Sequence, residues 1–206
     1  MKQINKYILE RLHINKDIKS NIYNYHPKTQ DELEELVNKL IKERGNNADL
    51  NDIDTSEITD MNYMFGLSIF NGDISKWDVS KVEDMSSMFA HSKFNGDISQ
   101  WDVSNVEDME WMFGNSEFTG KNGDISKCDV SKVKDMRFMF YKSLFNGDIS
   151  NWDVSNVKDM MCMFYFSEFT AKNGDISNWD VSNVKNMRRM LTWSPLEKNP
   201  PKWYKE

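Results

Sequence analysis

Apolar and polar positions alternate in two distinct ways within one short stretch of the chain. Trp77 and Val79 are separated by one polar residue, which is the period of a short strand with one buried face. The following Met85, Met88 and Phe89 stand at positions i, i+3 and i+4, which places them on one face of a helical turn. The pattern therefore predicts a short strand followed by a helical turn, with all five side chains in a core.

This stretch is one of six similar units. The signature Met-x-x-Met-Phe returns after 24 or 27 residues, and the first methionines of the units are Met61, Met85, Met109, Met136, Met160 and Met187. A fixed period of this length is typical of proteins in which each repeat buries its core against its neighbours. We therefore expect an α/β repeat solenoid of six 24–27-residue coils that stack through parallel strands.

The segment before the repeats carries the signals of a helix. Thr29 and Glu32 form a capping box, an apolar stripe follows, and Gly45 ends the helix. A shorter helix is expected at 6–13. Because the first coil of a solenoid exposes its core, these residues are expected to cover it, and an independent recognition domain is the alternative. The predicted organisation is a helical N-terminal cap at 1–50, a six-coil repeat at 51–196 and a C-terminal tail at 197–206.

The repeated string W-D-V-S-N-V-x-D-M-x-x-M-F-x-x-S-x-F-N-G-D-I-S covers residues 51–196. It resembles the short repeat of bacterial surface proteins and lipoproteins that are related to BspA-like leucine-rich repeats. The resemblance implies a right-handed, leucine-rich-repeat-like solenoid with no enzymatic activity and a role in binding or adhesion. Many relatives are exported and anchored to the cell envelope, so an envelope adhesin is one alternative function.

Composition narrows the class of protein. The 206 residues have a formal net charge of -7, which disfavours direct binding to nucleic acid or to an anionic membrane. No apolar run approaches the ~18 residues that a membrane-spanning helix needs, and no secretory signal is visible near the N-terminus. We therefore expect a cytoplasmic protein without a membrane span, with the cell surface as the alternative location.

Candidate catalytic and redox residues are few. The histidines His13, His26 and His91 are scattered and lack spaced partners, so each is expected to be an ordinary surface residue. Cys128 and Cys162 occupy different places in the repeat, which favours free structural thiols over a disulfide. The sequence predicts no enzyme, no cofactor and no metal site built from these residues.

One column of aspartates leaves an alternative open. Side chains at equivalent places in successive coils should stack as a ladder of like charges, which repel by about 1 kcal/mol per neighbour in water. Hydrogen bonds from the backbone of the following Val-Ser corner would offset this repulsion, and bound calcium is the alternative. The residues are Asp78, Asp102, Asp129, Asp153 and Asp180.

The columns that vary between repeats are where recognition is expected. Two such positions lie between the methionines of each signature, and two more follow its phenylalanine. We call these four positions the variable columns. They are rich in aromatic and basic residues, which is the composition of interaction hot spots. The predicted partner-binding residues are Tyr63, Trp111, Phe138, Tyr141, Tyr165, Phe166, Arg188, Arg189 and Trp193.

Charge is polarised along the repeats. Residues 51–120 carry 14 acidic and 3 basic side chains, whereas residues 121–206 carry 11 acidic and 14 basic ones. Such a dipolar molecule could associate head to tail with itself. The leading functional hypothesis is a non-enzymatic protein–protein interaction module. The alternatives are a phage- or mobile-element-encoded inhibitor of a host protein, whose acidic half mimics nucleic acid, and a cell-envelope adhesin.

Overall fold

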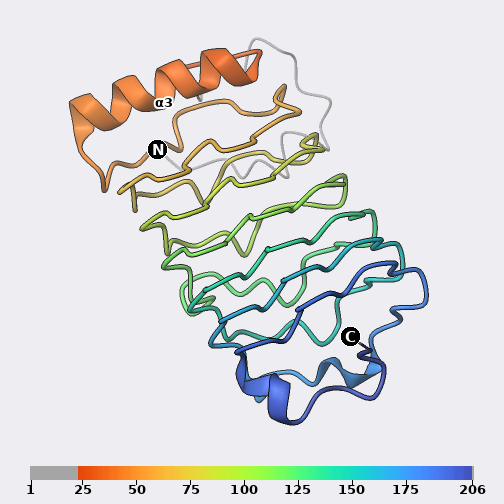
Figure 1. Cartoon of the computed structure of the whole chain (residues 1–206). Coiled ribbons are helices and arrows are strands. Elements are labelled where there is room, and N and C mark those ends of the chain that lie inside the picture. Colours follow the sequence, from red (N-terminus) through yellow and green to blue (C-terminus); the bar gives the residue numbers. More distant parts are fainter. Residues whose placement is uncertain (1–22, 206) are drawn as a thin grey trace.

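Residues 23–205 form a stack of similar layers of chain in a computed structural model (Figure 1). Within these residues there is one α-helix, α3 (Gln30–Arg44), at the N-terminal end of the stack. Two 3-10 helices, η1 (Ile176–Asn178) and η2 (Pro195–Lys198), lie near the C-terminal end. The remainder consists of turns and irregular chain.

Successive repeats are joined through every second backbone N–H group. In the second repeat, the N–H groups of Met85, Ser87 and Phe89 donate to carbonyl oxygens of the third repeat at 2.7–3.0 Å. The intervening N–H groups of Met88 and Ala90 donate to carbonyls three residues earlier in their own repeat. Alternate amides therefore build the turns of one layer and bind it to the next.

The fold-class prediction was wrong. The described residues contain no sheet, and their only ladder contacts are isolated parallel bridges between single residues. Five of the seven bridges join Asp84 to Asp108 or the equivalent positions of other repeats, and none involves the predicted Trp77–Val79 strand. The chain is thus not an α/β, leucine-rich-repeat-like solenoid of six coils, although its repeats do stack in sequence order.

Tight turns explain why neither the strand nor the helical turn forms. The N–H of Trp77 donates to the carbonyl of Ile74, three residues earlier, so the apolar alternation comes from a turn. Met88 donates to Met85 in the same way, and Ser87 between them has φ = 57°. A left-handed third residue is typical of a type II turn, and it breaks both helical and strand pairing.

The predicted core residues are nevertheless buried. Five phenylalanines, one from each of the first five repeats, stack through the centre with ring centroids 5.6–5.8 Å apart and are at most 1% exposed. We call them the inner ladder: Phe65, Phe89, Phe113, Phe140 and Phe164. The core methionines and valines pack around this ladder, so the repeat shares one continuous core.

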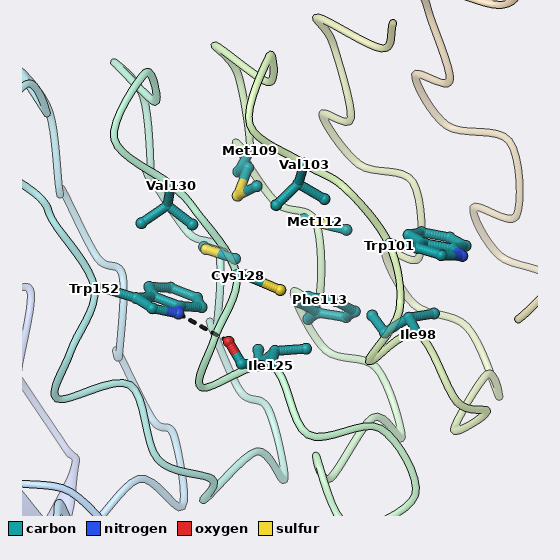
Figure 2. A pocket seen from close by; sticks show the side chains of 11 residues that line it. Ile98, Trp101, Val103, Met109, Met112, Phe113, Ile125, Cys128, Val130 and Trp152 are labelled. Atoms are coloured by element: carbon teal, nitrogen blue, oxygen red, sulfur yellow. Dashed lines mark hydrogen bonds between the residues drawn. The ribbon is translucent and has the colours of Figure 1, made fainter. Parts of the chain in front are cut away.

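The tryptophan column has one interruption. Trp101 and Trp152 each donate Nε1–H to a backbone carbonyl of an earlier repeat, at 3.2 and 3.0 Å. Between them the column holds Cys128, whose shorter side chain leaves an apolar cavity of about 20 Å³ (Figure 2). That is roughly the space of one water molecule, but the lining is apolar. The cavity is a packing defect rather than a ligand site.

Helix α3 covers the first repeat, and its bounds agree with the sequence prediction. Leu33, Val37 and Leu40 are buried in the core, and Gln30 Nε2 donates to Asn62 O at 2.8 Å. The helix ends at its predicted stop. The short helix predicted at 6–13 lies outside the described residues.

The capping box at the start of α3 forms only in part. Thr29 Oγ1 accepts from the N–H of Glu32 at 3.2 Å, as expected for an N-cap residue. The carboxylate of Glu32, however, accepts from the N–H of Lys28. In a capping box this carboxylate would accept from the N–H of the N-cap residue Thr29, so the second hydrogen bond of the box comes from one residue earlier.

The C-terminal tail extends the tryptophan column. Trp203 donates Nε1–H to Ile176 O at 2.9 Å and stacks on Trp179 with centroids 6.2 Å apart. The N–H of Trp193 donates to the carboxylate of Glu197 in η2. In earlier repeats the equivalent N–H, such as that of Phe166, donates to a carbonyl of the next layer. The tail therefore folds back over the last repeat.

Candidate functional site

Rings from the variable columns of five successive repeats form one continuous stack on the surface, in which rings of neighbouring repeats are stacked and two rings of the same repeat meet edge to face. Neighbouring ring centroids lie 4.8–5.8 Å apart. We call this stack the outer ladder. It consists of His91, Trp111, Phe138, Tyr141, Tyr165, Phe166 and Trp193. The structure thus brings together six of the nine residues that the sequence predicts to bind a partner.

The outer ladder is accessible to solvent. Phe166 is 47% and Trp193 is 63% exposed, and the four other predicted members are half-buried against each other. Stacking of this kind stabilises aromatic pairs by about 0.5–1.5 kcal/mol beyond burial. The ladder is therefore a pre-ordered apolar strip that still presents ring faces and edges to a partner.

Tyr63 stands apart from the other predicted residues. Its ring is 45% exposed, but among the described residues it makes no ring contact with the outer ladder. The second repeat places the small Ser87 between Tyr63 and Trp111, in the same column. This gap separates Tyr63 from the continuous surface.

Two further residues belong to the surface although they were not in the predicted set. The ring of His91 stacks on Trp111 at 5.8 Å, so it is not the ordinary surface histidine that the sequence suggested. Lys142 Nζ lies 5.4 Å from the ring centroid of Tyr141 and 5.8 Å from that of Phe166, within cation–π range. Both occupy the second position after the phenylalanine of the signature, which is one of the variable columns. Membership in that column was the feature of the sequence that could have identified them.

The variable columns have an unusual backbone. Among residues 23–205, 13 non-glycine residues have positive φ, and 12 of them occupy just two of these columns, including Trp111, Phe138 and Trp193. Glycine and asparagine are favoured at such angles, and a bulky residue there is strained by about 1–3 kcal/mol. Asn115 is the single asparagine of the set. Large side chains are thus held where stability alone favours small ones.

Towards the C-terminal end, the outer ladder borders a groove of about 350 Å³. Its lining residues come from the fourth, fifth and sixth repeats, and five of them were predicted as partner-binding residues. In one column the fourth repeat has Phe138 and the sixth has Arg189, whereas the fifth repeat has the smaller Cys162. The groove lies at this position. The lining is Phe138, Tyr141, Met161, Cys162, Tyr165, Arg188 and Arg189.

The thiol of Cys162 lies at the bottom of this groove. Burial raises its pKa, although the nearby Arg189 and Arg188 oppose that effect. Its Sγ lies 3.8 Å from Arg188 O, as a weak hydrogen-bond donor. The thiol therefore stays protonated at neutral pH, and it is a wall of the groove rather than a ready nucleophile.

The aspartate column is satisfied by local hydrogen bonds, as the first interpretation of the sequence proposed. Asp78 Oδ1 accepts from the N–H of Ser80 at 3.2 Å, and the four equivalent aspartates accept in the same way. For Asp129 the hydrogen bonds from Ser131 lower the pKa of the carboxyl group. Across residues 23–205, no three His, Cys, Asp or Glu side chains converge as a metal site.

A family model described as "Mycoplasma protein of unknown function, DUF285" matches residues 31–122 and, a second time, residues 116–204. The chain belongs to the DUF285 family. The two matches follow each other along the stack, and together they include α3, the repeats and most of the tail. Because the description assigns no activity, membership in DUF285 identifies the repeat but not its ligand.

Comparisons with curated proteins and with solved structures gave no match. No helix in the described part of this DUF285 chain is long and apolar enough to cross a membrane. Head-to-tail self-association and the expected lack of direct nucleic-acid binding stay predictions.

Proposed function

We propose that the chain is a non-enzymatic protein–protein interaction module that binds its partner through the outer ladder and the adjoining groove. The observation that carries the proposal is the continuity of this surface: rings from five repeats contact each other in series, and each of them is exposed or half-buried. Aromatic residues and arginine dominate the hot spots of protein interfaces. The surface has this composition along most of its length.

The backbone of the variable columns supports the same proposal. A core-building position tends to keep the residue that fits best, as the inner ladder keeps phenylalanine. The left-handed positions instead hold Trp111, Phe138 and Arg189, which are intrinsically disfavoured there. Backbone strain of this kind gathers at functional sites, where a side chain is retained for what it contacts.

The absence of catalysis is part of the proposal and rests on the lining of the groove. The lining of the groove contains no carboxylate or imidazole, and burial raises the pKa of its one thiol, Cys162, so that the thiol stays protonated. A nucleophilic mechanism needs a base within hydrogen-bond reach of the nucleophile. The groove offers apolar walls and two cations, which favour binding over chemistry.

Affinity capture tests the proposal. Immobilised wild-type chain and the variants Phe138→Ala, Tyr165→Ala and Phe166→Ala are incubated with lysate of the cells that carry the gene. We expect a specific partner to be captured by the wild type and to be lost from all three variants. Leu144→Ala is the matched control, because Leu144 is 49% exposed, close to the 47% of Phe166, but lies outside the variable columns. Equal capture by all variants would contradict the proposal.

The finer resemblance to BspA-like surface repeats suggests a second candidate function. If DUF285 repeats share that ancestry, the same aromatic surface would act outside the cell as an adhesin instead of in the cytoplasm. Protease treatment of intact cells distinguishes the two locations. Loss of the chain under conditions that spare cytoplasmic markers favours the adhesin, and full protection favours the cytoplasmic module.

A further inference from the structure

Two arginines at the C-terminal end of the stack form no ion pair with any residue of the described range 23–205. Residues 23–205 contain four arginines, of which Arg44 pairs with Asp52 and Arg137 pairs with two carboxylates. Arg188 and Arg189 are exposed, and neither forms an ion pair with any residue of the described chain. Both line the groove.

The repeat itself shows what Arg188 lacks. Arg137 occupies the same column as Arg188, and its Nε lies 2.8 Å from Asp135 Oδ2, two residues earlier. Its Nη2 lies 2.6 Å from Glu110 Oε2 of the preceding repeat. These two carboxylates hold the Arg137 guanidinium against the surface and neutralise it.

Both carboxylates are replaced around Arg188. Asn186 occupies the repeat position equivalent to that of Asp135, and Met161 occupies the position equivalent to that of Glu110. The amide of Asn186 is engaged, because Nδ2 donates to Asp159 Oδ2 at 3.0 Å and Oδ1 accepts from the N–H of Arg188. The Arg188 guanidinium is therefore left free for an anion from outside the described chain.

The groove beside these arginines suits a side chain. Its volume of about 350 Å³ lies within the range of ligand pockets, ~300–1,000 Å³. Phe138, Tyr141 and Tyr165 supply aromatic walls, and Met161 adds a deformable apolar surface. One aromatic or aliphatic residue could enter here while its neighbours reach the arginines at the rim.

We propose that this groove binds an acidic peptide segment, with an apolar side chain in the groove and flanking carboxylates on Arg188 and Arg189. The inference rests on the proposed function and names the chemical class of the partner. Charge complementarity supports it, because charge-assisted bonds to arginine are shorter and stronger than neutral ones. A nucleic acid fits less well, since a continuous polyanion would extend along the stack towards residues 51–120, which carry 14 acidic and 3 basic side chains.

Fluorescence anisotropy with a defined probe tests the inference. The probe is a fluorescein-labelled peptide with one phenylalanine flanked by two glutamates on each side, and its control has glutamines in place of the glutamates. We expect saturable binding of the acidic peptide that weakens with added salt, and little binding of the control. Arg188→Gln and Arg189→Gln should each weaken binding about tenfold.

Two further variants separate a binding role from a structural one. Asn186→Asp restores a carboxylate beside Arg188 without removing either arginine, and it should weaken binding about as much as Arg188→Gln. Arg137→Gln removes an arginine of the same column that is already neutralised, so binding should change less than about twofold. Circular dichroism and thermal melting confirm that each variant is folded.

Three outcomes would overturn the inference. One is equal affinity of the wild type and the Arg188→Gln, Arg189→Gln double variant. The others are tighter, arginine-dependent binding of oligothymidylate, or of phosphatidylserine vesicles, than of the acidic peptide. If the aromatic variants still lose the captured partner, the proposed function survives such a failure. Conversely, arginine-dependent peptide binding with unchanged partner capture supports the acidic-peptide site and contradicts the proposed function.

Discussion

The inner ladder and the outer ladder are built from neighbouring positions of the same repeats, the first in the core and the second at the surface. Rings of the inner ladder lie 5.6–5.8 Å apart and are nearly parallel, and all of them are phenylalanine. Rings of the outer ladder lie 4.8–5.8 Å apart, but their identity changes from repeat to repeat. The repeat spacing sets a similar stacking distance in both places, whereas solvent decides whether the residue type is constrained.

The difference shows how a repeat separates stability from recognition. A ring of the inner ladder touches neighbours on all sides, so a change of shape leaves a cavity or a clash. A ring of the outer ladder contacts the rings before and after it, but part of its surface stays open to solvent. The outer positions can therefore change while the stack persists, and they carry the left-handed strain described above.

The largest expected effect comes from removing one ring from each ladder. Phe113→Ala should lower the free energy of unfolding by about 3–5 kcal/mol, because Phe113 is 1% exposed and the vacated space cannot collapse fully. Phe138→Ala in the outer ladder should lower it by less than about 1.5 kcal/mol. Urea denaturation measures both, and similar losses would show that the outer ladder is also a structural element.

A second prediction concerns the gap in the interior at Cys128. Cys128→Val should raise the free energy of unfolding by about 0.5–2 kcal/mol, because the small added apolar volume fits the cavity of about 20 Å³. Cys128→Ala should lower it, since the cavity grows. The opposite order of the two variants in thermal melting would mean that the backbone around Cys128 has already adjusted to the small residue.

A third prediction tests backbone strain in the columns of the outer ladder. Ser87 has φ = 57° and makes no contribution to the ring stack, so Ser87→Gly should raise the free energy of unfolding by about 0.5–1 kcal/mol. Ala90→Gly is the control, because Ala90 has no positive φ and should lose stability by a similar amount. If both glycines destabilise the chain equally, the left-handed positions carry no strain.

The smallest effect is expected in the column of bridged aspartates. Burial raises the pKa of Asp108, and the charges of Asp135 and Asp84 add to this, so the ionised group destabilises the folded state at neutral pH. Asp108→Asn should therefore gain less than about 1 kcal/mol at pH 7. The wild type binds more protons when folded, so this gain should vanish as the pH falls towards and below 3.8, the ordinary pKa. Denaturation at several pH values measures it, and a gain that grows in acid would contradict the assignment.

The sequence predicted burial better than it predicted secondary structure. The spacing of Met85, Met88 and Phe89 correctly placed these side chains in the core. The same spacing suggested a helical turn, which was wrong because a left-handed residue between the methionines produces a series of tight turns. Side-chain spacing reports which residues share a face, and several backbone paths can satisfy it. The nine candidate residues remain predictions as a binding site, although six of them meet in one surface.

Sequence by itself determined the period, the core columns, the helix at 30–44 and the columns in which variation is tolerated, because each of these is written in the order of residues. Tertiary structure alone decided that the variable rings from separate repeats touch, that His91 and Lys142 join them, and that Arg188 lacks the carboxylates that neutralise Arg137. Those facts depend on which side chains of neighbouring layers come within a few ångströms of each other, and that is fixed only when the layers stack.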